Sequence, residues 1–154
     1  MENHQTVTLT DGQLWEIIGD LQVGNRIFYN KKSGETKSLI DLDSYGEVIE
    51  EMVDEWKEVE SNWHDYVEIT NMDSTKAFEL MEDFLEEVDD VSFKSRLTDA
   101  LNRRKPFANF KMEIENSADY REKWFKFRDQ KMKEFVLAQL DRKIKADVDI
   151  EEDE

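Results

Sequence analysis

The chain has 154 residues, the size of one ordinary globular domain, and a formal net charge of −17, which should repel nucleic acid and anionic membranes. Its 38% hydrophobic and 11% aromatic residues can offset the entropy of ordering, so we expect a folded chain. It has no cysteine, no run of eighteen apolar residues and no basic, apolar start, so we expect a cytoplasmic protein without disulfides, signal peptide or membrane span.

The first forty residues predict a helix followed by a β-hairpin. Thr10 and Gln13 fit a capping box, apolar residues then recur at helical spacing, and Gly24 suits a left-handed stop. Aromatic and β-branched residues flank a turn that contains Gly34, so residues 25–40 predict the hairpin.

The next segment predicts an amphipathic helix and a further strand. Ser44 and Glu47 fit a second capping box, and the apolar residues from Val48 to Trp56 then hold one face of a helix. Residues 66–70 alternate and are rich in strand-forming residues, so they predict a third strand beside the hairpin.

Four helices are predicted in the second half of the chain. The first follows Asp73 and carries an apolar stripe to Val88, and the second spans residues 91–104 after a break at Asp89 and Asp90. The third begins at Pro106, whose missing N–H has no partner in a first helical turn, and ends at Asn116 and Ser117. The fourth runs from about Ala118 to about Lys143, and an acidic tail at residues 147–154 is expected to be disordered.

This order of elements predicts a mostly helical α+β fold. The expected fold has an N-terminal helix, a small β-hairpin or three-stranded antiparallel sheet, and then four to five packed helices. We expect residues 1–146 to form a single globular domain. Four aromatic residues at helical spacing are predicted to lie in the core that joins the last three helices: Phe107, Phe110, Trp124 and Phe127.

The charges are unevenly distributed along the chain. Residues 41–90 carry 19 acidic and 2 basic groups, whereas residues 91–146 carry 15 basic and 8 acidic groups. Basic and aromatic residues interleave in the second segment, as phosphate contact with base stacking would require, but basic helix faces are usually solvated or ion-paired. The candidate interaction surface consists of Arg103, Arg104, Lys105, Lys111, Arg121, Lys126 and Arg128.

No catalytic, cofactor-binding or metal-ligating residue is predicted. Residues 41–46 resemble the start of an EF-hand loop, but Tyr45 and Met52 stand where carboxylates are needed, so a helix cap explains the segment better. His64 next to Asp65 is the one histidine–carboxylate pair that the sequence suggests for acid–base chemistry, and a single imidazole does not make an active site. A zinc site is not supported either, because the chain has two histidines and no cysteine.

Three segments of the second half resemble a known family. They are residues 97–101, residues 105–111 and residues 124–128, with residues 81–85 matching an earlier helix of the family. The chain resembles the bacterial Uncharacterised Protein Family one-five-eight, which has no assigned activity. The resemblance implies a bacterial, cytoplasmic protein and transfers no catalytic residue. Many relatives carry Arg where this chain has Ala108 and Asn109, which weakens a phosphate-binding interpretation.

The sequence therefore favours a non-enzymatic interaction or regulatory module. This hypothesis has three motives. No catalytic group of residues is recognisable, the acidic and basic residues are concentrated in different segments, and many aromatic residues lie on predicted helix faces. Two alternatives remain open: nucleic-acid association through residues 103–133, and an enzyme with an unrecognised carboxylate site. We expect a protein partner, no cofactor, and no useful binding to nucleic acid or membrane, and a homodimer remains open.

Overall fold

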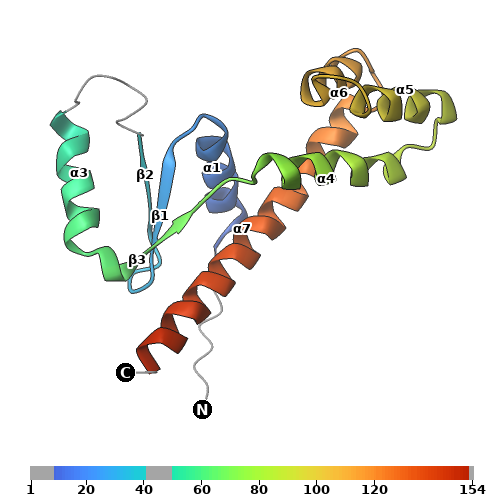
Figure 1. Ribbon diagram of the computed structural model, residues 1–154. Helices are drawn as coiled ribbons and strands as arrows, with labels where there is room; N and C mark the ends of the chain where they lie inside the picture. Colours follow the sequence, from blue (N-terminus) through green and yellow to red (C-terminus); the bar gives the residue numbers. More distant parts are fainter. Residues whose placement is uncertain (1–8, 41–49, 153–154) are drawn as a thin grey trace. The chain divides into compact units, whose positions relative to one another are not determined.

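The computed structural model describes residues 9–40 and 50–152 (Figure 1). Their contacts divide the chain into two compact units. The first unit contains the chain up to Asn71 together with the residues from Lys133 onward, and the second contains residues 72–132. Helix α7, Arg121–Glu152, contributes residues to both units. The expectation of a single domain stays a prediction.

The first unit contains the hairpin and the third strand that the sequence predicts. Its elements are α1 (Asp11–Gln22), β1 (Arg26–Asn30), β2 (Thr36–Leu39), α3 (Glu50–Ser61), the short 3-10 helix η1 (Trp63–Asp65) and β3 (Tyr66–Ile69). The capping box of Thr10 and Gln13 is present, and Gly24 and Gly34 have φ angles of 89° and 76°, which favour glycine. The predicted Ser44 cap lies outside the described residues.

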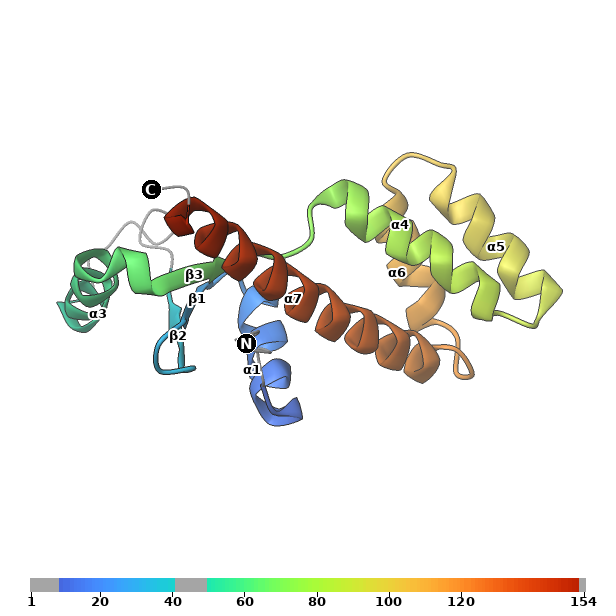
Figure 2. The same ribbon diagram turned by 90° about the horizontal axis from the view of Figure 1, so that it is seen from below.

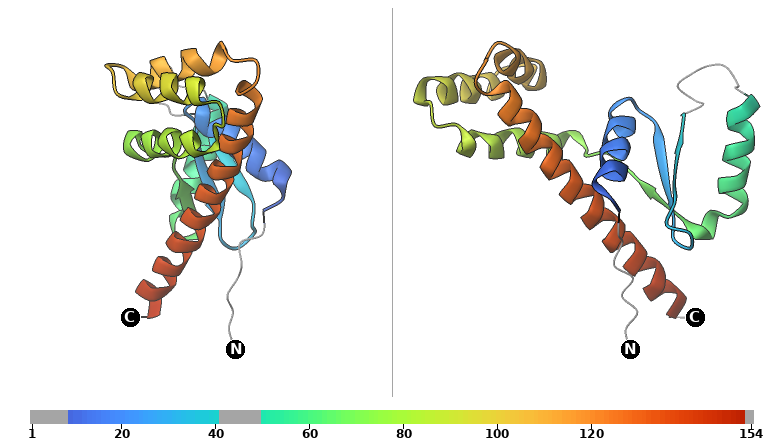
Figure 3. Two further views of the ribbon diagram at one scale, coloured as in Figure 1. Left: turned by 90° about the vertical axis from the view of Figure 1, so that its right-hand side faces the viewer. Right: turned by 180° about the vertical axis from the view of Figure 1, so that it is seen from behind.

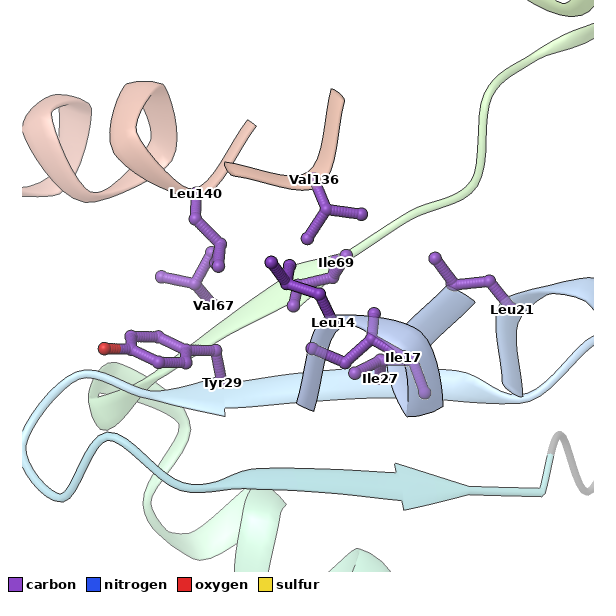
Figure 4. Packing of buried hydrophobic residues seen from close by; sticks show 9 residues of the cluster. All are labelled: Leu14, Ile17, Leu21, Ile27, Tyr29, Val67, Ile69, Val136 and Leu140. Atoms are coloured by element: carbon purple, nitrogen blue, oxygen red, sulfur yellow. The ribbon is translucent and has the colours of Figure 1, made fainter. Parts of the chain in front are cut away.

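The three strands form an antiparallel sheet in the order β2-β1-β3. Because side chains alternate along a strand, the sheet has two apolar faces, and α1 and α3 cover opposite ones (Figure 3). Figure 4 shows the face on which Ile27 and Ile69 pack against α1 and against Val136 and Leu140 of α7. On the other face, Phe28 packs against α3.

Side chains of α7 close the outer edge of β3. Gln139, only 2% exposed, accepts a hydrogen bond from the Thr70 N–H at 2.8 Å and donates one to the Thr70 carbonyl at 2.9 Å. The Lys143 ammonium donates to the Glu68 carbonyl at 2.8 Å. The amide of Gln139 thus bonds as a neighbouring strand would, and part of an exposed strand edge is satisfied within the unit.

The second unit is helical (Figure 2). Its buried side chains form a core of their own. Its elements are α4 (Ser74–Phe84), the 3-10 helix η2 (Leu85–Glu87), α5 (Val91–Leu101), α6 (Pro106–Glu115) and the first turns of α7. Asp90 caps α5 and Pro106 occupies the start of α6, as predicted, and Asp73 caps α4. Phe84 and Phe110 meet edge to face at the centre of this core.

Three expectations differ from the structure. The helix predicted over residues 91–104 ends at Leu101, so Arg103 and Arg104 lie beyond it. Helix α7 ends at Glu152 and not near Lys143, so residues 147–152, assigned from the sequence to a disordered tail, form its last turns. Asp147 accepts an ion-pair contact of 2.9 Å from Lys31, which helps to hold this segment. Phe107 was predicted to be a core residue, but it is 43% exposed because it lies in the first turn of α6, where only Phe78 among the described aromatic rings contacts it.

Candidate functional site

Three of the predicted cations lie in the connection between α5 and α6. Arg103 pairs with Asp99 at 3.2 Å, one helical turn earlier. Lys105 has a φ angle of 59°, which is unusual for a residue with a side chain, and precedes Pro106 as the cap residue of α6. The side-chain amide of Asn109 donates to the Arg104 carbonyl at 2.8 Å. This hydrogen bond holds the connection against α6, so its backbone is fixed although the cations are exposed.

Helix α6 exposes apolar and basic side chains beside and opposite its buried face. Phe110 and Ile114 are buried on one side, each about 1% exposed. Phe107 borders this buried side, whereas Met112 lies roughly 140° further round the helix and Lys111 lies between them, since each residue advances an α-helix by about 100°. Met112 is 58% exposed. We call the exposed residues of this region the α6 surface: Arg104, Lys105, Phe107, Ala108, Lys111 and Met112.

The cations of the α6 surface are not neutralised within the described part of the chain. Arg104, Lys105 and Lys111 make no ion pair with any residue that the structure describes. The sequence from Asn102 to Met112 carries four basic residues and no acidic one. Positive charge is therefore concentrated in the α5–α6 connection, although Glu113 and Glu115 follow on α6 and the whole chain is strongly acidic.

The other three predicted cations lie on α7 and are engaged differently. Lys126 pairs with Glu122 at 3.5 Å. The guanidinium groups of Arg121 and Arg128 lie over the Phe125 ring, 5.6 and 5.0 Å from its centroid, and Arg128 also pairs with Asp129 at 3.3 Å. Arg121 and Arg128 share one face of α7, whereas Lys126 lies roughly 140° away from Arg121. The seven candidates thus divide into two groups. Arg104, Lys105 and Lys111 have no ion pair among the described residues, whereas the other four contact a carboxylate or an aromatic ring.

Sequence reasoning missed Met112 and misplaced Phe107. Periodicity puts Phe107 close to the stripe of Phe110 and Ile114, so no local signal separates it from the core. Met112 carried a usable signal, because it falls on the opposite side of α6 from that stripe.

A titratable cluster lies on the α3 side of the sheet. Glu58 accepts hydrogen bonds from the Tyr66 hydroxyl and from Lys37, both at 2.8 Å. The hydrogen bond to Lys37 lowers the pKa of Glu58, the same contact raises the pKa of Lys37, and burial raises the pKa of Tyr66. General acid–base chemistry needs a pKa near the working pH. Each shift here fixes the ordinary ionisation state, so the cluster behaves as a structural ion pair.

The remaining polar features give no stronger chemistry. Burial lowers the pKa of Lys143, but its ammonium donates to the Glu68 carbonyl and to Gln139, which occupies it in holding the β3 edge. His64 is exposed in η1. Among the side chains that the structure describes, no three acidic or histidine residues gather as metal ligands would. The EF-hand-like residues 41–46 lie outside the described residues.

No helix within the described ranges is both long enough and apolar enough to cross a membrane. No solved structure matches the chain. One relative, a UPF0158 protein of Pseudomonas aeruginosa, is 30% identical over 73 residues, which are 47% of this chain and 48% of the relative. The match thus spans about half the length of this curated relative. The model of the Uncharacterised protein family (UPF0158) matches residues 17–153. The chain therefore belongs to the UPF0158 family, as the sequence resemblance indicates.

Proposed function

We propose that this chain is a non-enzymatic interaction module that binds a protein partner through the α6 surface. One observation carries the proposal: α6 exposes two large apolar side chains, Phe107 and Met112, and between them Lys111, a cation without an ionic partner among the described residues. Exposed apolar side chains bordered by polar ones are typical of protein-binding surfaces.

The energetics of the unit support a surface that is kept for binding. Phe110 supplies the buried side of α6. The exposed Met112 is therefore not needed for the core, and a polar residue would serve folding equally well there. Phe107 rests edge to face on Phe78 with ring centroids 6.5 Å apart, which limits its rotamers before a partner arrives. A side chain that is ordered in advance loses less entropy on binding.

The titratable groups do not favour the enzyme alternative. The pKa values of Lys37, Glu58 and Tyr66 are shifted away from neutral pH. The Lys143 ammonium donates hydrogen bonds to two acceptors. Nucleic-acid association is supported only by the cations of the α6 surface, and the net charge of −17 opposes it.

Site-specific photo-crosslinking tests the proposed function. A photoreactive phenylalanine analogue replaces Met112 in the full chain, and a matched chain carries it at Ser95, an exposed position of α5 in the same unit. In cells that express these chains, we expect discrete protein adducts from position 112 that position 95 does not form. Identical adduct patterns at the two positions, or adducts to nucleic acid alone at position 112, would refute the proposed function.

A further inference from the structure

The two outer edges of the sheet in the first unit differ. At the β3 edge, Gln139 and Lys143 of α7 bond the backbone. At the β2 edge, the backbone groups of Thr36 and Ser38 have no hydrogen-bond partner among the residues that the structure describes. We propose that the β2 edge binds an extended, basic segment of a partner protein, which adds a fourth strand to the sheet. This inference concerns the first unit and does not depend on the proposed function of the α6 surface.

The hydrogen-bond register shows which backbone groups of β2 point away from the sheet. The Asn30 N–H donates to the Glu35 carbonyl at 2.8 Å, so these two residues form a hydrogen-bonded pair. Hydrogen-bonded and non-hydrogen-bonded pairs alternate along an antiparallel ladder. Thr36, the next residue, and Ser38 therefore belong to non-hydrogen-bonded pairs, and their backbone groups point outward. Each of them offers one N–H donor and one carbonyl acceptor to an incoming strand.

The lysine in β2 does not block this edge. A lysine on an edge strand ordinarily opposes pairing with another chain. The Lys37 ammonium, however, pairs with Glu58 of α3 at 2.8 Å, and this hydrogen bond raises the pKa of Lys37. Its side chain is therefore held on the α3 side of the sheet, and its charge is met within the unit. Thr36 and Ser38 are partly exposed, so an incoming backbone can reach them.

Unpaired backbone groups at strand spacing select an extended peptide. Another strand supplies alternating donors and acceptors that match those of Thr36 and Ser38. A helix has already bonded its own backbone groups, and phosphate groups offer acceptors only. The occupant that satisfies both the N–H and the carbonyl groups of this edge is therefore an extended protein segment.

A second copy of the chain fits the β2 edge less well. The antiparallel register that pairs Thr36 of each copy with Ser38 of the other places the two Lys37 residues directly opposite each other. Like charges at directly opposite positions destabilise a strand pair. Each copy also carries a net charge of −17, which opposes self-association.

The charge of the chain sets the sign of the segment. A net charge of −17 attracts a basic segment and repels an acidic one. Glu35, directly before β2, is exposed and forms no ion pair with any described residue. A cation opposite Glu35 and an uncharged residue opposite Lys37 therefore suit this edge best.

The probe is a synthetic, fluorescein-labelled peptide that alternates valine and threonine between two terminal lysines, with the order Lys-Val-Thr-Val-Thr-Val-Lys. A matched peptide has glutamate in place of both lysines. Fluorescence polarisation with the full chain should give a dissociation constant on the order of 100 μM for the basic peptide, because a few backbone hydrogen bonds hold it. The acidic peptide should bind at least about tenfold more weakly.

Methylated peptides test the backbone pairing. The N–H groups of an added strand point alternately towards β2 and away from it. One basic peptide is therefore methylated at the backbone nitrogens of both threonines, and another at those of the last two valines. One of the two should bind at least about tenfold more weakly than the other, because only one set of N–H groups faces β2. Their charge is the same, so attraction by net charge alone would leave them equal.

Amide hydrogen exchange locates the binding site in the unaltered chain. At a peptide concentration about ten times the dissociation constant, exchange of the Thr36 and Ser38 N–H groups should slow at least about fivefold. The Lys37 N–H lies in a hydrogen-bonded pair with β1 and should change less than about twofold.

One variant removes an outward donor of the edge. Ser38→Pro lacks this N–H and should weaken peptide binding at least about fivefold, and proline is tolerated where the N–H of an edge strand faces outward. Ser38→Ala is the matched control, because both variants lose the 3.2 Å hydrogen bond from Asn25 to the Ser38 hydroxyl and only the alanine variant keeps the N–H. The control should bind within about twofold of the unaltered chain. Circular dichroism and thermal melting establish that each variant folds.

Several results would overturn the inference. They are no binding of the basic peptide below about 1 mM, equal binding of the two methylated peptides, and binding that leaves exchange at Thr36 and Ser38 unchanged. Exchange at Ser38 that slows as the protein concentration rises, without any peptide, would assign the edge to a second copy of the chain. If Ser38→Pro does not fold, the methylated peptides and the exchange of the unaltered chain decide the question.

Discussion

Replacing Gln139 by leucine should destabilise the first unit by opening the edge of β3. In the structure the amide of Gln139 pairs with both the N–H and the carbonyl of Thr70. Leucine has a similar size, so the change creates little cavity, but it leaves both backbone groups without these partners. A buried polar group that loses its hydrogen bond costs about 1–3 kcal/mol. Thr70 is itself exposed and water reaches part of it, so we expect about 2 kcal/mol in total.

Urea denaturation followed by circular dichroism measures this change in the free energy of unfolding. Thr70→Val is the matched control, because it removes the 3.0 Å hydrogen bond between the Thr70 hydroxyl and Gln139 but keeps both backbone bonds. It should cost no more than about 1 kcal/mol. Amide hydrogen exchange at residue 70 should accelerate in Gln139→Leu and not in the control. A loss below about 0.5 kcal/mol with unchanged exchange at Thr70 would refute the strand-edge role of Gln139.

Three further predictions follow from buried and charged contacts. Phe110→Ala should lower the free energy of unfolding, measured by urea denaturation, by about 3–5 kcal/mol, and Phe107→Ala by under about 1.5 kcal/mol. Equal losses would contradict the different burial of these two rings on α6. Glu58 has a lowered pKa, so its contribution is present above the unfolded pKa of about 4.3 and is lost as the pH falls through the folded value. Glu58→Gln should therefore flatten the fall of the melting temperature between about pH 5 and pH 3, and a curve parallel to that of the unaltered chain would count against the ion pair. Truncation after Ala146 removes the half-exposed pair of Asp147 with Lys31 and should cost at most about 1 kcal/mol, whereas a loss above 2 kcal/mol would mean that the end of α7 packs more firmly.

Short-range signals in the sequence predicted most of the elements correctly. Thr10 with Gln13, and Asp90 before α5, identify helix starts because a cap side chain bonds the backbone only two or three residues away. Gly24 and Pro106 mark a stop and a start for equally local reasons of backbone geometry. The end of α7 was placed too early because charged residues at helical positions carry no clear stop signal.

The candidate surface was predicted only in part. Arg104, Lys105 and Lys111 were singled out as cations, but the sequence did not separate them from Arg103 and Lys126, which have ionic partners. An ion pair depends on where two flexible side chains meet, and several acids were within reach of each cation along the chain.

The sequence alone determined the family, the fold class and the start of nearly every described element, since these depend on residue types and on spacings within one or two turns. Tertiary structure alone decided that Gln139 pairs with Thr70, 69 residues earlier, because no periodicity records which polar side chain a distant helix brings to a strand edge. It also decided that Phe110 is buried while Phe107, three residues before it, is exposed. Both residues fit the same helical stripe, and only the extent of the neighbouring core distinguishes them.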